Sequence, residues 1–186
     1  MNHDQFNIVV PALPHVSEFL KFNYGSPVEF IEGDLFYDYL VQAVSRRPDK
    51  ESFDENKIKM ARYTEKLTIL VPRKFYTTHG LFLTRSNTIK LNRFIDEYIK
   101  SVVRMEMISA FAATGRAEAG YEIARVKLGI TVDAYPLDSV KKHWQRFIAS
   151  KPGIISKKFL TQVSPMILDQ LQTMYKNANN RTISSI

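Results

Sequence analysis

Apolar residues recur at helical spacing between residues 114 and 150, and this pattern predicts two helices joined by a polar connector. At about 100° per residue, the apolar side chains of the second helix share one face, which should bury its tryptophan against a neighbouring helix. They are Leu137, Val140, Trp144, Phe147 and Ile148. The first helix is expected to end at Leu128-Gly129-Ile130, because glycine readily takes the left-handed conformation there.

The starts of the two helices also have local signals. Thr114 is placed to cap the first helix with its hydroxyl, and Pro136 suits the first position of the second. Asp138 in the first turn of the second helix interacts favourably with the helix dipole. The pair therefore has the outline of a helix-turn-helix. Its connector from Gly129 to Tyr135 is longer than the turn of roughly three or four residues typical of that motif.

The outer face of the second helix carries polar and basic side chains. On this face, or flanking it, are Ser139, Lys142, His143, Gln145 and Arg146. Side chains of these types contact phosphates and guanine edges in duplex DNA. A charged outer face is also the ordinary property of an amphipathic surface helix. DNA recognition and plain helical packing thus remain alternatives at this point.

In the N-terminal half, short apolar runs and turn residues predict strands mixed with short helices. Strands are predicted at residues 6–10, 27–31, 67–71 and 81–84, helices at 17–22 and 34–44, and a turn at 75–78. The first strand is expected to be stopped by Pro11 and Pro14. Val10-Pro11 and Tyr24-Gly25 have counterparts in Val71-Pro72 and His79-Gly80, which fits either a degenerate duplication or chance matching.

A long helix is predicted from Ile89 to about residue 113, capped by Ser86-Asn87-Thr88. The expected fold is therefore α+β: a small mixed sheet with flanking helices, a long spine helix, and a helical, helix-turn-helix-like C-terminal part. Residues 1–88 form the α+β region with a charged loop at 45–66. Residues 89–186 form the helical region, which includes two further short helices after residue 153.

Charge is distributed unevenly along the 186 residues, whose formal net charge is +7. Residues 1–45 hold one basic and six acidic side chains, whereas residues 141–186 hold eight basic and one acidic. A basic C-terminal part indicates an anionic partner, duplex DNA being the one we expect. The same asymmetry also permits head-to-tail association into a homo-oligomer.

Several classes of protein are disfavoured by the sequence. Cysteine is absent, which excludes disulfides and thiolate metal sites. No apolar run approaches the ~20 residues of a membrane span, and no signal-peptide pattern is present. No glycine-rich phosphate motif occurs, and the four histidines lie far apart. We therefore expect no membrane, metal, cofactor or small-molecule substrate, and a cytoplasmic location.

Two acidic sets are candidate metal sites. The first comprises Glu29, Glu32, Asp34 and Asp38; it would suit a divalent cation, but acids are favoured in the first turn of a helix in any case. The second is Asp49 and Glu55 with Lys57, which superficially resembles the acid-acid-lysine set of metal-dependent nucleases. Such a set needs adjacent strands, and this segment is polar, so nuclease activity is a minor alternative.

The leading hypothesis is a non-enzymatic DNA-binding protein that uses its basic C-terminal helix. Its layout resembles that of small regulators from phages and mobile elements, although no family motif is present. The alternative is a structural protein of an oligomeric assembly such as a virion, with the acidic N-terminal and basic C-terminal parts as contact surfaces.

Overall fold

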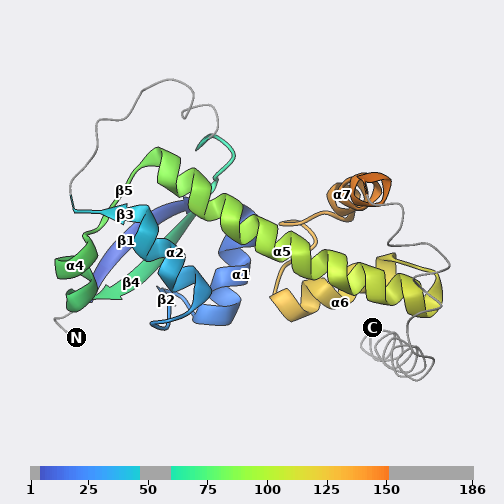
Figure 1. Ribbon diagram of the computed structural model, residues 1–186, viewed down its shortest axis with the longest axis horizontal. Helices are drawn as coiled ribbons and strands as arrows, with labels where there is room; N and C mark the ends of the chain where they lie inside the picture. The colour runs from blue at the N-terminus through green and yellow to red at the C-terminus, as the bar shows by residue number, and fades with distance from the viewer. Residues whose placement is uncertain (1–4, 47–59, 151–186) are drawn as a thin grey trace. The chain divides into compact units, whose positions relative to one another are not determined.

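The computed structural model describes residues 5–46 and 60–150. The chain divides into two compact units, residues 1–99 and 100–186, and helix α5 (Arg85–Thr114) runs through the division (Figure 1). The sequence places its boundary after residue 88, nearer the start of the same helix. The predicted helices after residue 153 and most of the charged loop lie outside the described residues.

The first unit is α+β, as the sequence predicts. Its main sheet has the strand order β1-β4-β2, with β1 antiparallel and β2 parallel to the central β4. These strands are β1 (Gln5–Ala12), β4 (Glu65–Pro72) and β2 (Val28–Glu29). Two further short strands, β3 (Val44–Ser45) and β5 (Phe82–Leu83), form an antiparallel pair. The predicted mixed sheet is therefore confirmed. Strands β2 and β5 are shorter than the predicted strands at residues 27–31 and 81–84.

Alternation along β1 and β4 buries one face of the sheet. Ile8 pairs with Ile69 and Val10 with Leu67, and all four side chains are buried. The intervening Val9 is 61% exposed, as the twofold period of a strand requires. The register thus follows from the sequence pattern, because a slip of one residue would turn the apolar set towards the other face.

The expectation that Pro11 ends the first strand is wrong. β1 continues to Ala12, and Pro11 pairs with Lys66. Within the described sheet β1 is an edge strand, where a residue without an N–H group is tolerated. The carbonyl of Pro11 accepts a hydrogen bond of 2.9 Å from the Asn92 side chain on α5.

Two helices of this unit are longer than predicted. Helix α1 spans Pro14–Tyr24, beginning at the proline rather than at residue 17, and the predicted turn at 75–78 lies inside helix α4 (Arg73–His79). Helix α2 (Leu35–Ala43) agrees with the prediction and is capped by Asp34, whose side chain accepts from Phe36 N.

The chain order strand, helix, strand, helix occurs twice in the first unit, first as β1-α1-β2-α2 and then as β4-α4-β5-α5. Both short helices end at a glycine with similar backbone angles, Gly25 at φ 86° and Gly80 at φ 89°. Each glycine N–H donates to a carbonyl four residues earlier, that of Lys21 or Tyr76. The two segments therefore share an order of elements and a glycine helix end, in addition to the matching residues in their sequences.

Helix α5 begins at Arg85, four residues before the predicted start at Ile89. The residue that caps it is Thr84, whose hydroxyl accepts from Asn87 N at 3.1 Å. The predicted capping segment is instead helical. Asn87 donates its side-chain amide to Ala43 O, and the Thr88 hydroxyl donates to Thr84 O. A local run of capping residues does not reveal which of them the tertiary structure uses.

Polar side chains of α5 hold the corner between β1 and α1. Leu13 N donates to Asn92 Oδ1 at 3.0 Å, and His15 Nε2 lies 3.0 Å from Asp96 Oδ1. Both His15 and Asn92 are buried. Buried polar groups of this kind are stable only when paired, so they fix α5 against the strand-to-helix turn.

The second unit is helical in its described part. It contains residues 100–114 of α5, helix α6 (Glu118–Leu128) and helix α7 (Leu137–Ser150). The two helices predicted between residues 114 and 150 are thus present. Among the described residues, none of the helices has the length and apolar character that crossing a membrane would need.

Candidate nucleic-acid interface

The start of α6 is not capped as the sequence predicts. Thr114 is the last residue of α5, and its hydroxyl donates to Ala110 O at 2.8 Å. The same oxygen accepts from Arg116 N, so it closes the turn between the helices. The N-cap position of α6 is occupied by Ala117, which offers no side-chain cap. The hydroxyl therefore serves the helix that ends there and not the one that begins.

A close helix crossing holds α6 on the C-terminal part of α5. A Cβ atom built on Gly120 would lie within 2.3 Å of Glu106 O and 2.6 Å of Met107 Cα. Buried Ala110 and Ala113 on α5 extend this interface, and Ala119 packs against them. Small side chains allow the two backbones to approach, so the position of α6 depends on Gly120 having no side chain.

The end of α6 agrees with the prediction. Gly129 takes the left-handed conformation at φ 65°, and Ile130 N donates to Arg125 O at 3.0 Å. Ile130 is buried, as expected for a residue that folds back on its helix.

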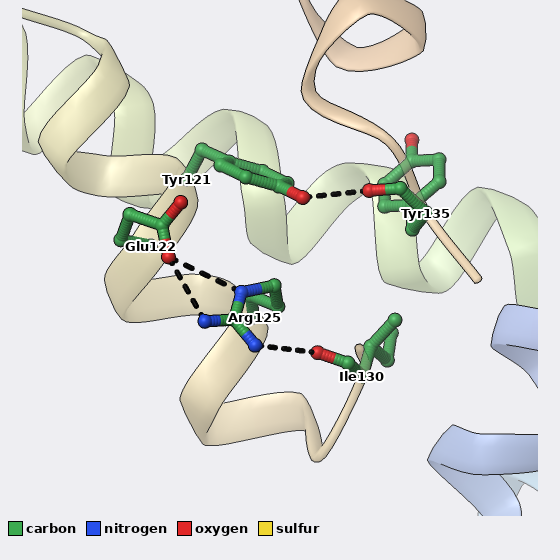
Figure 2. Close-up of polar contacts among 5 residues, drawn as sticks. All are labelled: Tyr121, Glu122, Arg125, Ile130 and Tyr135. Carbon is green, nitrogen blue, oxygen red and sulfur yellow. Dashed lines mark hydrogen bonds and ion pairs between the residues drawn. The ribbon is translucent and has the colours of Figure 1, made fainter. Parts of the chain in front are cut away.

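The long connector is tied to α6 by two side chains (Figure 2). The Tyr121 hydroxyl donates to Tyr135 O at 2.6 Å, and Arg125 Nη1 donates to Ile130 O at 3.2 Å. Arg125 also forms an ion pair with Glu122 at 3.0 Å, which holds its guanidinium in place. Burial raises the pKa of Tyr121, so its hydroxyl remains a donor. These contacts position α7 although the turn is longer than that of a standard helix-turn-helix.

The inner face of α7 agrees only in part with the prediction. Val140 is buried, whereas Trp144 is half-buried and lines a surface cavity. The expectation of a fully buried tryptophan is therefore wrong. Phe147 packs beside it, with ring centroids 6.0 Å apart, and the Arg104 guanidinium lies 5.7 Å from the Phe147 ring. An aromatic ring that faces a cavity is available to a ligand.

The outer face of α7 brings together four of the five predicted side chains. Ser139, Lys142, Gln145 and Arg146 are all exposed on this helix. His143 is half-buried and has an interaction of its own, so it flanks the exposed set and is less accessible than predicted. The exposed set offers two cations, a hydroxyl and an amide along one helix.

Three glutamates of the second unit are paired with basic residues other than Lys142 and Arg146. Glu106 pairs with Lys127 at 2.6 Å and Glu118 with Lys141 at 2.8 Å, while Glu122 pairs with Arg125. The hydrogen bond with Lys141 lowers the pKa of Glu118 and raises that of Lys141.

Among the described residues, these three pairs do not involve Lys142 or Arg146, and both cations are exposed on the outer face of α7. Asp138, in the first turn of the same helix, is also exposed.

Asp34, one residue of the first acidic set, has a structural role. Asp34 caps α2 and also accepts a hydrogen bond of 2.6 Å from the Tyr24 hydroxyl. Across residues 5–46 and 60–150, no group of three or more acidic, histidine or cysteine side chains is arranged to hold a metal ion. The nuclease-like Asp49, Glu55 and Lys57 lie outside the described residues.

No family model matches this chain, and comparisons with curated proteins and with solved structures also give no match. The site is therefore interpreted from its own geometry and chemistry.

Proposed function

We propose that this protein is a non-enzymatic DNA-binding protein and that the outer face of α7 contacts the duplex. The observation that carries the proposal is the exposure of Ser139, Lys142, Gln145 and Arg146 on one helix, while Glu106, Glu118 and Glu122 pair with other cations. Exposed lysine and arginine side chains attract the phosphates of a nucleic-acid backbone.

Each side chain of the face suits a distinct kind of contact. Lys142 serves as a point charge for a phosphate, whereas the guanidinium of Arg146 can bind a phosphate or a guanine edge with two hydrogen bonds. Ser139 and Gln145 supply shorter-range hydrogen bonds to backbone or base edges. The anchored connector supports this role, because a helix held in place loses less entropy on binding.

The salt dependence of DNA binding tests the proposal. With the two phosphates that Lys142 and Arg146 would neutralise, affinity for a duplex should fall on the order of ten-fold between about 50 and 200 mM salt. Fluorescence anisotropy of a labelled duplex measures this directly. An absence of association even at the lowest salt concentration would refute the proposed function.

An assembly role, with a location in a virion or another homo-oligomer, is the second candidate. It is favoured by large apolar side chains that are exposed in the acidic N-terminal part of the chain. Phe22 is 63%, Ile31 73% and Leu35 54% exposed. The acids Glu32 and Asp38 belong to the same segment of the sequence. Apolar surface patches with polar residues at their rim are typical of protein–protein contacts. In this alternative, the basic face of α7 would bind the acidic region of a neighbouring copy.

A further inference from the structure

A surface cavity of about 530 Å³ lies within the second unit, beside the outer face of α7. It is lined from α5 by Met107 and Phe111, from the turn and the start of α6 by residues 115–118, and from α7 by Lys141, Trp144 and Gln145. A volume of this order is within the range of roughly 300–1,000 Å³ found for small-ligand sites.

Part of the lining of the cavity is apolar and aromatic. Met107 is buried, and the rings of Phe111 and Trp144 are half-buried. Tryptophan and phenylalanine rings that remain accessible at the surface of a basic unit are the side chains on which nucleobases stack. Stacking does not depend on base identity, because every base presents a flat π-face.

Charged and polar side chains form the rest of the lining. Arg116 and Gln145 are exposed, and the Glu118–Lys141 ion pair supplies an acceptor and a donor at 2.8 Å from one another. A nucleobase presents both donors and acceptors on its edge, so it matches a rim of mixed polarity better than a purely apolar group does. The Arg116 guanidinium adds positive charge where a phosphate would follow the base.

We propose that this cavity receives an unpaired nucleobase from a nucleic-acid strand whose phosphates lie along α7. The inference rests on the proposed function, since Lys142 and Arg146 hold the strand. Gln145 connects the two sites, because it lies on the exposed face of α7 and also lines the cavity. The ligand class is therefore single-stranded nucleic acid, or a duplex with an unpaired base.

Trp144 is the single tryptophan of the chain, so its fluorescence reports on the cavity without labelling. The full-length protein is titrated with a single-stranded oligothymidylate and with an abasic oligonucleotide of equal length and charge. The oligothymidylate should quench the fluorescence saturably and bind on the order of ten-fold more tightly than the abasic strand. Equal affinities for the two strands would overturn the proposal.

Two variants test whether the preference for the base-containing strand arises at the cavity. Phe111→Leu keeps an apolar side chain but removes a ring from the cavity, and Phe22→Leu removes an exposed ring from the first unit. Phe111→Leu should lower the preference for the base-containing strand several-fold, whereas Phe22→Leu should leave it unchanged. If Phe111→Leu fails to fold, the comparison of the two strands on the wild-type protein still decides.

The possible failures are distinguishable. If duplex binding depends on Arg146 but the abasic strand binds as well as the oligothymidylate, the cavity proposal fails and the DNA-binding proposal stands. If neither duplex nor single strand binds, both fail. A cavity that serves a protein side chain instead would show no quenching by either oligonucleotide, and this result also contradicts the proposal.

Discussion

The Nζ atom of Lys141 lies 2.8 Å from Oε1 of Glu118, and this ion pair joins the first turn of α6 to α7. Lys141 and Lys142 are neighbours in sequence, yet only Lys141 is used between the helices. Lys142 is exposed on the outer face of α7. Adjacent lysines thus have different roles because successive residues of a helix point about 100° apart.

The first prediction concerns this ion pair. The hydrogen bond with Lys141 holds the pKa of Glu118 below its ordinary value of 4.5. Because the folded-state pKa is lowered, the contribution of the pair to stability is present above that ordinary value and is lost as the pH falls through the folded-state pKa. An NMR titration of the carboxyl group should show the pKa of Glu118 rising in Lys141→Met.

The matched control is Lys127→Met, which removes the ion pair with Glu106 and should leave the pKa of Glu118 lowered. An unchanged Glu118 pKa in Lys141→Met would show that the contact between α6 and α7 does not form in solution.

The second prediction concerns the crossing of α5 and α6. Gly120→Ala introduces a Cβ atom that would meet the backbone of Glu106 and Met107, so the helices must separate. We expect a destabilisation of about 1–3 kcal/mol, measured by urea denaturation. Val126→Ala on the exposed side of the same helix is the control and should stay within about 0.5 kcal/mol. Equal stability of the two variants would contradict the close crossing.

The third prediction concerns the connector. Tyr121→Phe removes the hydroxyl that donates to Tyr135 O and should lower the free energy of unfolding by about 1 kcal/mol or more. The control is Tyr76→Phe, since Tyr76 is exposed on α4 and should tolerate the change. Thermal denaturation of both variants measures the difference. Loss of the hydroxyl without any effect would mean that the connector is positioned by other contacts.

Much of the fold was predictable because its determinants are local. The α+β class, the cap of α2 by Asp34 and the glycine end of α6 follow from residue type and spacing. The outer face of α7 was predictable for the same reason, since helical periodicity alone separates Lys142 and Arg146 from Val140.

The remaining features depend on which segments meet in space. Pro11 is tolerated because β1 lies at an edge of the described sheet, which the strand sequence alone does not indicate. Thr114 could cap either of two helices, and the backbone around it determines which. Trp144 is on the predicted face, but its burial depends on the neighbouring helices, which leave a cavity beside it.

The residues of the proposed cavity that sequence reasoning missed also depend on which segments meet in space. Arg116 and Phe111 line the cavity, and Glu118 pairs with Lys141 across more than twenty residues of sequence. These residues do not belong to any sequence motif that would have indicated a binding site. The available signal was the run of small residues around Gly120, which indicates a close helix crossing and hence a shared surface for α5 and α6.

The most direct test of the account is the affinity of a DNA duplex for two double variants. Lys142→Ala with Arg146→Ala removes the two cations of the α7 face, and Lys90→Ala with Arg93→Ala removes two exposed cations of α5. The α7 variant should bind more weakly, with a salt slope reduced by about two, while its stability stays within about 0.5 kcal/mol of the wild type. The α5 variant should bind like the wild type. If instead the α7 variant keeps full DNA affinity and light scattering shows that it has dissociated from an oligomer, the face serves assembly and the DNA-binding account is wrong.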